Sequence, residues 1–486
     1  MESASLIVAE ASRFAEWDPN PTTRAYVAAR LQPTPVVTEL EPLFGKRIRF
    51  GTAGLRARMA PGISCINDLV VLQTAQGICR YAQRVFGIER LKSQGIVVGY
   101  DHRRSLEFQL SSKRFAEITT IVFASEGIPV YLFGEIVATP FVPFCIVQRQ
   151  CCAGIMVTAS HNPKEDNGYK IYWNDGVQIT APHDSGIAKS ILDNLEPWPK
   201  VRQLLKEDAP TFDVVSDPTQ ELTEAYFRIN TTKLARHPPP SDRLDIMYTA
   251  MHGVGHKWAQ KMFQSFDLAP FIPVPSQVAP DPDFPTTRKP NPEERGALDD
   301  AKAVATEGKL ANRNKLILAN DPDADRLAVA EYDVLDGSSQ GTWATFSGNE
   351  IGVMLAHWQW ENRLNNNVAT AEETQASRIP QKYAMVTTTV SSRMLERMAK
   401  VEGFYYEETL TGFKWLGNCC KRLQAEGYKV LLSYEEAIGF CLSDEVFDKD
   451  GINAAAVFAE LAVRIASRSP PHYFSKCPIL CLVHCF

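Results

Sequence analysis

The sequence predicts an α/β protein built from three consecutive layered domains. Short apolar runs rich in β-branched residues alternate with helix-like stretches along most of the chain. A chain of 486 residues is also too long for one ordinary hydrophobic core. We expect an N-terminal extension at residues 1–40, a first domain at 41–240, a second at 241–342, a third at 343–467 and an irregular tail at 468–486.

Apolar runs define the elements of the first domain. They predict strands at residues 96–101, 128–133 and 153–157, with a helix from Leu106 to Glu126 between the first two. A polar, helix-prone segment follows. The proline run after His237 then marks a boundary near residue 240.

The second and third domains repeat the alternation. In the second, a strand at 243–251 precedes a glycine turn at 252–255, and a strand at 315–320 leads into an acidic loop. In the third, the expected helices are 350–360, 392–400 and 413–427, and the expected strands are 383–390, 404–408 and 429–433.

Charge and hydropathy narrow the class of partner. The chain has 51 Lys and Arg against 57 Asp and Glu, a net charge of −6. An acidic balance argues against general nucleic-acid or anionic-membrane binding, so we expect a small-molecule partner. No apolar run approaches the length of a membrane span, and the first twenty residues lack a secretory pattern, so a cytosolic location is expected.

Ser160 and His161 follow directly after the strand expected at 153–157. The turn that Asn162 and Pro163 favour would present the Ser160 hydroxyl to solvent, where it can carry an acyl or a phosphoryl group. An acyl-transfer triad is one alternative, but the glycine-flanked nucleophile elbow is missing. A polar turn in which Ser160 caps backbone amides is the other.

Three carboxylates, Asp321, Asp323 and Asp325, alternate in the loop after the strand at 315–320. An EF-hand loop would need glycine at its sixth place and glutamate at its twelfth, which Arg326 and Tyr332 occupy here. A plain acidic turn remains an alternative. Because like charges at alternate positions repel, the pattern favours a hard divalent cation, which suits phosphoryl chemistry.

Three further segments are candidates for substrate contacts. Residues 49–56, RFGTAGLR, form a glycine-bracketed turn that suits a phosphate, or an ordinary loop. Residues 434–439, YEEAIG, place carboxylates at a strand end, where they suit sugar hydroxyls or simply face solvent. Residues 409–414, TLTGFK, predict a capped helix start, which alone would explain Thr411.

Six motifs occur in the order typical of one enzyme family: GTAGLR, TASHNPKEDNGYKIYW, DPDADR, TGFKWLG, YEEAIG and FDKDG. On these motifs the chain resembles the phosphohexomutase superfamily. It is most similar to the phosphoglucomutase-2 branch, which includes phosphopentomutase and glucose-1,6-bisphosphate synthase. The resemblance implies layered domains of the phosphoglucomutase type around a central cleft.

The resemblance also implies roles for individual residues. Ser160 would carry the phosphoryl group, and Asp321, Asp323 and Asp325 would hold Mg²⁺ together with an oxygen of the phosphorylated serine. The other implied site residues are Arg56, His161, Lys170 and Arg326 around the transferring group, and Thr411, Gly412, Glu435 and Lys449 for the substrate. A sugar bisphosphate is the implied activator.

Two departures from the family pattern affect the expected function. Ala437 occupies the position where the glucose-preferring branch has serine. The missing hydroxyl favours pentose phosphates as substrates, or a relaxed specificity. The phosphate-gripping loop of the family's fourth domain does not occur after Lys449, so we expect that domain to be absent and substrate affinity and turnover to be weakened.

We therefore expect a mutase that interconverts the 1- and 5-phosphates of ribose or deoxyribose and the 1- and 6-phosphates of glucose. A synthase that makes glucose 1,6-bisphosphate from 1,3-bisphosphoglycerate is an alternative within the same class. A truncated, non-catalytic form that binds a phosphosugar or a partner is an alternative from another class.

Overall fold

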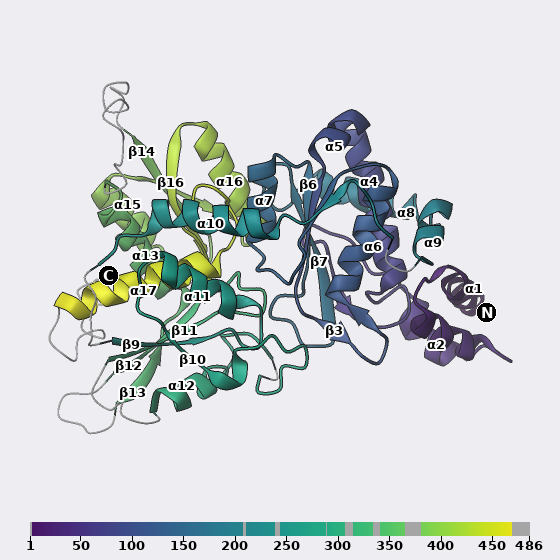
Figure 1. Ribbon diagram of the computed structural model, residues 1–486, viewed down its shortest axis with the longest axis horizontal. Coiled ribbons are helices and arrows are strands. Elements are labelled where there is room, and N and C mark those ends of the chain that lie inside the picture. Colours follow the sequence, from purple (N-terminus) through teal and green to yellow (C-terminus); the bar gives the residue numbers. More distant parts are fainter. Residues whose placement is uncertain are drawn as a thin grey trace. The chain divides into compact units, whose positions relative to one another are not determined.

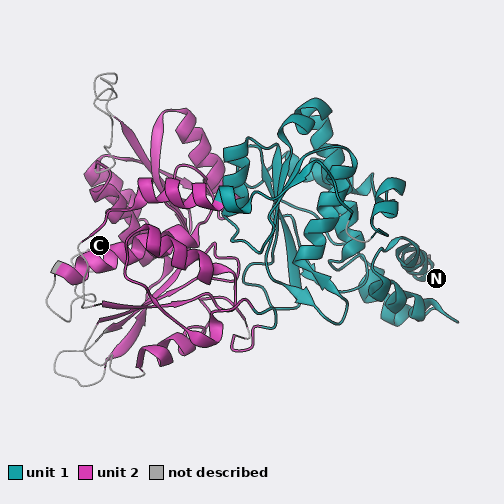
Figure 2. Ribbon diagram, in the orientation of Figure 1, with its two compact units in different colours: residues 1–222, 281–283 teal, residues 223–280, 284–486 magenta. Residues whose placement is uncertain are grey.

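The chain forms two compact units in the computed structural model, residues 1–222 with 281–283 and residues 223–280 with 284–486 (Figure 2). The described residues are 2–207, 210–238, 244–287, 289–306, 314–333, 341–364 and 381–468. The tail expected at 468–486 thus lies almost wholly outside the described residues, as does the boundary expected near residue 240. The domain boundaries stay predictions.

A mixed six-stranded sheet forms the centre of unit 1 (Figure 1). Its order is β1-β7-β6-β2-β5-β8, with β7 antiparallel to both β1 and β6 and the other neighbours parallel. Every residue of β2 and β6 is buried, as expected of central strands covered on both faces. The strands are β1 (Leu55–Arg58), β2 (Ile96–Tyr100), β5 (Val130–Leu132), β6 (Ala153–Val157), β7 (Asp166–Trp173) and β8 (Val215–Ser216), beside a separate hairpin of β3 (Arg104–Ser105) and β4 (Leu110–Ser111).

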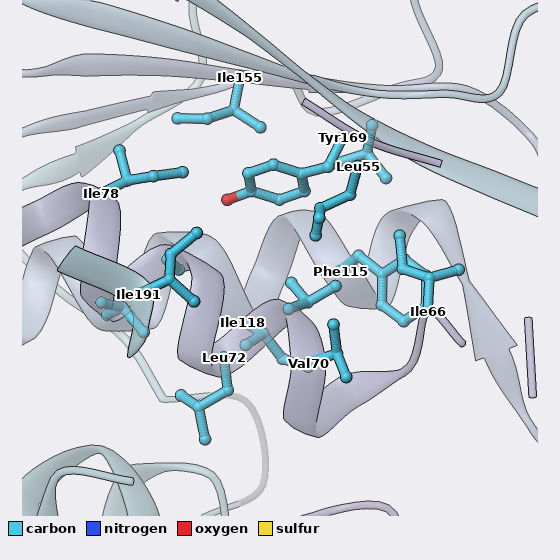
Figure 3. Packing of buried hydrophobic residues seen from close by; sticks show 14 of the residues in the cluster. Leu55, Ile66, Val70, Leu72, Ile78, Phe115, Ile118, Ile155, Tyr169 and Ile191 are labelled. Carbon is cyan, nitrogen blue, oxygen red and sulfur yellow. The ribbon is translucent and has the colours of Figure 1, made fainter. Parts of the chain in front are cut away.

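Helices supply the other half of the unit 1 core. Ile155 and Tyr169 point from the sheet toward helices that carry Val70 and Phe115 (Figure 3). The one polar atom of Tyr169 in this core, its hydroxyl, lies 2.7 Å from the Thr119 hydroxyl. The helices are α1 (Glu2–Trp17), α2 (Pro21–Leu31), α3 (Val37–Phe44), α4 (Asp68–Phe86), α5 (Ile88–Gln94), α6 (Ser112–Ser125), α7 (Phe141–Arg149), α8 (His183–Leu192) and α9 (Pro199–Leu204).

The helix expected from Leu106 to Glu126 begins six residues later than predicted. The β3–β4 hairpin occupies the intervening residues, and Gln109 in its turn has a positive φ of 52°. Ser111 then caps α6, because its side chain accepts a hydrogen bond from the N–H of Arg114. The apolar pattern alone did not reveal this cap.

The described residues of unit 2 form two sheets. One has the order β10-β9-β11-β12-β13 and the other β15-β14-β16-β17, and each ends in an antiparallel hairpin. The strands are β9 (Leu244–Thr249), β10 (Ile272–Pro273), β11 (Asn314–Ala319), β12 (Ala328–Asp333), β13 (Thr342–Thr345), β14 (Lys382–Thr388), β15 (Tyr405–Thr409), β16 (Tyr428–Glu435) and β17 (Gly439–Cys441). The helices are α10 (Thr219–Leu234), α11 (Gly255–Ser265), α12 (Asp299–Thr306), α13 (Gly348–Glu361), α15 (Met394–Glu402), α16 (Phe413–Ala425) and α17 (Gly451–Arg468), with a 3₁₀ turn at Pro275–Gln277.

The two sheets of unit 2 meet at their loops. The acidic loop joins β11 to β12, and residues 436–438 join β16 to β17. Leu327 donates its N–H to the carbonyl of Ile438 at 3.0 Å, and Arg326 forms an isolated bridge with Gly439. The expected α/β class with successive layered domains is confirmed, and the fold brings the acidic loop and the YEEAIG segment together.

None of the helices in the described part of the chain combines the length and the apolar character that a membrane crossing requires.

Candidate active site

Ser160 lies in a tight loop between β6 and β7 of unit 1. Its φ is 52°, a left-handed conformation that is uncommon for any residue with a side chain. The expectation that the turn would present Ser160 to solvent is wrong, because the residue is only 3% exposed. The loop folds back on itself, and the Ser160 N–H donates to the Thr158 hydroxyl at 2.9 Å. A backbone strained and enclosed in this way is typical of functional sites.

The neighbours of Ser160 include three of the other predicted residues. The Ser160 hydroxyl lies 3.3 Å from Nδ1 of His161. Arg56 on β1 donates from Nη1 to the side-chain oxygen of Asn162 at 2.9 Å, so it reaches the same loop. Lys170, on β7, is opposite Met156 of β6 and is buried. Unit 1 thus places Arg56, His161 and Lys170 on the elements that flank Ser160.

The turn before β1 depends on glycine. Gly54 has a φ of 74°, and a Cβ at this position would lie 1.8 Å from the carbonyl oxygen of Tyr169. Only glycine therefore allows residues 51–54 to pack this closely against β7. This packing sets where β1 begins and so where Arg56 projects.

Arg103 also belongs to this site, although it was not among the predicted residues. Its guanidinium is buried and donates to four carbonyl oxygens of the Ser160 loop. The sequence signal was slight, an arginine two residues after Asp101 at the end of an apolar strand. An arginine with no other signal around it is usually a solvent-exposed charge.

Asp321, Asp323 and Asp325 cluster in the loop between β11 and β12 of unit 2. All three are buried, and one carboxylate oxygen of each lies within 4.8 Å of the others. The loop turns at Ala324, whose φ is 56° and whose N–H donates to the Asp321 carbonyl at 2.9 Å. Burial raises the pKa of Asp321 well above its usual value, and the neighbouring Asp323 and Asp325 carboxylates raise it further.

The donor set of this cluster fits a divalent cation. It consists of carboxylate oxygens alone, which are the ligands that hard cations such as Mg²⁺ and Ca²⁺ take. Three carboxylates this close in a buried loop repel each other, and a cation between them would remove that repulsion. The group could therefore hold a metal ion.

Asn320 anchors the acidic loop and was likewise not predicted. Its side-chain oxygen accepts a hydrogen bond from the Tyr248 hydroxyl at 2.6 Å. Its amide nitrogen donates to the carbonyls of Arg326, at 2.6 Å, and Gly451, at 3.0 Å. One side chain thereby ties both ends of the acidic loop to the start of α17.

Two cations, Lys449 and Arg326, and the carboxylate of Glu435 lie beside the acidic loop. Nζ of Lys449 lies 3.5 Å from Oδ2 of Asp325. Burial would lower the pKa of Lys449, but the carboxylates of Asp325, Asp448 and Glu435 outweigh it and raise the pKa. Arg326 behaves in the same way, since Asp321 and Asp325 raise its pKa despite burial. Both side chains therefore remain cationic.

Glu435 ends β16 within this group. Burial raises its pKa, while Lys449 and Arg326 oppose that rise. The next residue, Glu436, accepts hydrogen bonds from the hydroxyls of Thr388, at 3.0 Å, and Ser391, at 3.1 Å. These bonds hold the turn after β16 against the end of β14.

Thr411 and Gly412 lie at the start of α16. The helix begins at Phe413, as predicted, but Gly412 occupies the N-cap and no side chain caps it, so the expected side-chain cap is wrong. Thr411 is exposed. Nζ of Lys449 lies 5.0 Å from the centre of the Phe413 ring, which connects this helix start to the cationic group.

The predicted residues thus form two groups, one in each unit. Unit 1 brings together Arg56, Ser160, His161 and Lys170, and unit 2 brings together Asp321, Asp323, Asp325, Arg326, Glu435 and Lys449 with Thr411 and Gly412 nearby.

Three family models match successive parts of the chain. They describe the α/β/α domains I, II and III of phosphoglucomutase/phosphomannomutase, at residues 47–197, 219–334 and 347–474.

Several curated proteins are similar over nearly the whole chain. Human phosphopentomutase is 44% identical over 466 residues, which cover 95% of this chain and 72% of that protein. Human glucose 1,6-bisphosphate synthase is 40% identical over 93% of this chain and 69% of its own length. Phosphoribomutase of Saccharomyces cerevisiae is 39% identical over 91% of this chain and 69% of its length.

Solved structures are similar in fold. A putative phosphomannomutase from Thermus thermophilus aligns over 90% of this chain and 84% of its own with a TM-score of 0.64 at 21% identity. A phosphoglucomutase/phosphomannomutase family protein from Burkholderia thailandensis aligns over 90% of this chain and 79% of its own with a TM-score of 0.62 at 18% identity.

Proposed function

Because this chain belongs to the phosphoglucomutase/phosphomannomutase family, we propose that it is a phosphosugar mutase acting on pentose phosphates. The substrates would be ribose or deoxyribose 1-phosphate, converted to the 5-phosphate, with glucose 1-phosphate as a second substrate. The observation that carries the proposal is the buried cluster of three carboxylates with the two cations Arg326 and Lys449 beside it. The similarity to phosphopentomutase and phosphoribomutase supports the pentose assignment.

Mg²⁺ is the proposed cofactor. Asp321, Asp323 and Asp325 would hold it, and an oxygen of phosphorylated Ser160 would complete the set. When bound, the ion would neutralise negative charge on the oxygens of a phosphoryl group. All three carboxylates are buried, so bulk solvent competes little for their oxygens.

Ser160 is the proposed carrier of the phosphoryl group. In the first step, a sugar hydroxyl attacks the phosphorus atom on Ser160, the bond from phosphorus to Oγ breaks, and a sugar bisphosphate forms. Oγ leaves with the bonding electrons and takes up a proton, for which His161 is the proposed donor, with its Nδ1 3.3 Å from Oγ. The proton lost by the attacking hydroxyl balances this uptake.

The second step reverses the first at the other end of the sugar. Ser160 Oγ attacks the other phosphate of the bisphosphate, and the bond from that phosphorus to the sugar oxygen breaks. The phosphoserine is restored, and the net reaction moves one phosphate along the sugar. A sugar bisphosphate supplied from solution would phosphorylate an unmodified Ser160 by the same step, which explains its expected role as activator.

The remaining residues bind and orient. Arg56, Lys170 and Arg326 would contact phosphoryl oxygens, since guanidinium and ammonium groups donate to them strongly. Glu435 would accept from sugar hydroxyls, with Lys449, Thr411 and Gly412 lining the substrate. Positioning and charge of this kind account for most of the catalysis of phosphoryl transfer.

Synthesis of glucose 1,6-bisphosphate is a second candidate, which the 40% identity to the human synthase favours. In that reaction 1,3-bisphosphoglycerate would phosphorylate Ser160, and glucose 1-phosphate would receive the group.

A coupled assay separates the two candidates. We expect ribose 1-phosphate to turn over with a catalytic amount of sugar bisphosphate, and glucose 1-phosphate to turn over more slowly. Accumulation of glucose 1,6-bisphosphate in proportion to added 1,3-bisphosphoglycerate, without pentose turnover, would assign the synthase instead. Lack of both activities together with lack of phosphate on Ser160 would overturn the proposal.

A further inference from the structure

We propose that Arg103 is a positioning residue for phosphoryl transfer, which holds the backbone of the Ser160 loop in its reactive shape without touching the substrate. The inference rests on the proposed function only where it predicts an effect on catalysis. The geometry itself concerns unit 1 alone. None of the motifs that identified the site includes Arg103.

The contacts of Arg103 are concentrated on one loop. Its Nη2 donates to the carbonyl of Ser160 at 2.6 Å and to that of Asn162 at 2.7 Å. Its Nη1 donates to the carbonyl of Pro163 at 2.7 Å and to that of Asp166 at 3.0 Å. The side chain is fully buried beneath the loop. One guanidinium therefore satisfies four carbonyls within seven residues.

Three of these carbonyls, of Ser160, Asn162 and Pro163, belong to the loop outside the β6–β7 ladder, and the fourth belongs to Asp166, the first residue of β7. Buried backbone oxygens without a hydrogen bond cost stability. The Pro163 carbonyl also accepts the N–H of Asp166 at 3.0 Å, and Arg103 supplies a side-chain donor to all four oxygens. Only a planar fork with several donors can reach four oxygens that converge from different directions. The left-handed φ of Ser160 is thus maintained by bonds on both sides of the residue, to Thr158 and to Arg103.

The direction of the peptides gives Arg103 a second effect. In a trans peptide the C=O and the N–H point to opposite sides. Because the carbonyls of Ser160 and Pro163 point at Arg103, the N–H groups of His161 and Lys164 point away from it. The buried cation thereby orients the positive ends of these peptide dipoles toward the outer side of the loop, where they suit an anion.

Arg103 is itself held in place by Asp101. Oδ1 of Asp101 accepts a hydrogen bond from the backbone N–H of Arg103 at 2.9 Å. Oδ2 of the same carboxylate lies 3.4 Å from the side-chain Nε of Arg103. The N–H of Asp101 donates to the carbonyl of Val157, the last residue of β6, at 3.0 Å. The strand that precedes Ser160 and the arginine beneath the loop therefore share one anchor at the end of β2.

Arg103→Lys is the direct test, because lysine keeps the charge but has a single nitrogen that cannot span four carbonyls. We expect kcat to fall about 100-fold, since displacement of a reacting group by about 1 Å has an effect of that size. KM should change less than about threefold, because Arg103 does not contact the substrate. The matched control is Arg114→Lys, in the same unit, where the arginine pairs with Asp68 and not with the loop. It should leave kcat unchanged.

Amide hydrogen exchange supplies a readout that needs no activity. Peptides covering residues 158–167 should exchange faster in Arg103→Lys than in the wild type, whereas Arg114→Lys should leave them unchanged. If Arg103→Lys exchanges like the wild type in this segment, or keeps wild-type kcat, the inference is wrong. If the wild-type protein never acquires phosphate on Ser160, the proposed function fails instead, and the exchange result still decides the role of Arg103 in the loop.

Discussion

Lys449 lies with its ammonium nitrogen 3.5 Å from Oδ2 of Asp325, at the edge of the carboxylate cluster. Both side chains are nearly buried, so their attraction is weakly screened by solvent. Lys449 thus offsets part of the negative charge of the cluster when no metal is bound. It also brings a cation to the place where we propose that a phosphosugar binds.

Replacement of Lys449 by methionine should therefore affect the reaction strongly. Loss of a charged donor to a phosphosugar costs about 1.5–3 kcal/mol, so we expect kcat/KM to fall about 10- to 100-fold. Lys421→Met is the control, because Lys421 also lies over a phenylalanine ring, at 5.2 Å from Phe447, but has no proposed substrate contact. Equal losses in the two variants would contradict the role given to Lys449.

Asp323→Asn tests the metal site through stability. Without metal, the variant should melt at a higher temperature than the wild type, because one charge leaves a repulsive buried cluster. Saturating Mg²⁺ should raise the wild-type melting temperature, with about 2.7 kcal/mol gained at a concentration 100 times Kd, and should raise that of the variant much less. Asp299→Asn, on α12, is the exposed control. If Mg²⁺ leaves the melting temperature of the wild type unchanged, the proposed metal site is excluded.

Ala437→Ser tests sugar preference. Ala437 lies in the turn between β16 and β17, directly after Glu436 and partly exposed. A hydroxyl here would add one hydrogen bond to a hexose, worth about 1 kcal/mol. We expect the ratio of kcat/KM for glucose 1-phosphate to that for ribose 1-phosphate to rise about fivefold. An unchanged ratio would show that Ala437 does not set the preference.

Glu460 makes stability depend on pH. Burial raises its pKa from 4.5 to about 7, although the N–H groups of Arg236 and His237 donate to it. The folded state therefore keeps a proton that the unfolded state loses, and the free energy of unfolding falls as pH rises from 4.5 to 7. The size is on the order of 3 kcal/mol, at about 1.4 kcal/mol per pKa unit.

Denaturant unfolding of the wild type and Glu460→Gln across this pH range checks the effect. The variant cannot titrate at this position, so the stability difference between the two proteins should shift in its favour as pH rises. A difference that stays constant with pH would mean that folding does not raise the pKa of Glu460.

Much of the fold could be predicted because buried strands leave continuous apolar runs. The strand before Ser160 matches β6, and the strand before the acidic loop matches β11. The acidic loop was also predictable, since alternating carboxylates repel unless a fold and a cation hold them together. Periodicity could not place the start of α6, because that start depends on the single cap Ser111.

The supporting residues of the site could not be predicted in the same way. Arg103 acts on carbonyls 57 or more positions away, and nothing in its local sequence distinguishes it from an exposed arginine. Asn320 likewise gains its role from Tyr248 and Gly451, which are distant in sequence. Local pattern thus indicates the reacting groups, and tertiary structure alone reveals what holds them.

The phosphorylation state of Ser160 tests the central claim most directly. The protein should be incubated with labelled glucose 1,6-bisphosphate and Mg²⁺, and the label located by mass spectrometry of its peptides. We predict label on Ser160 in the wild type and in Ser185→Ala, a control at an exposed serine of unit 1, and none in Ser160→Ala. Label at the wild-type level on the Ser160→Ala protein would contradict the account.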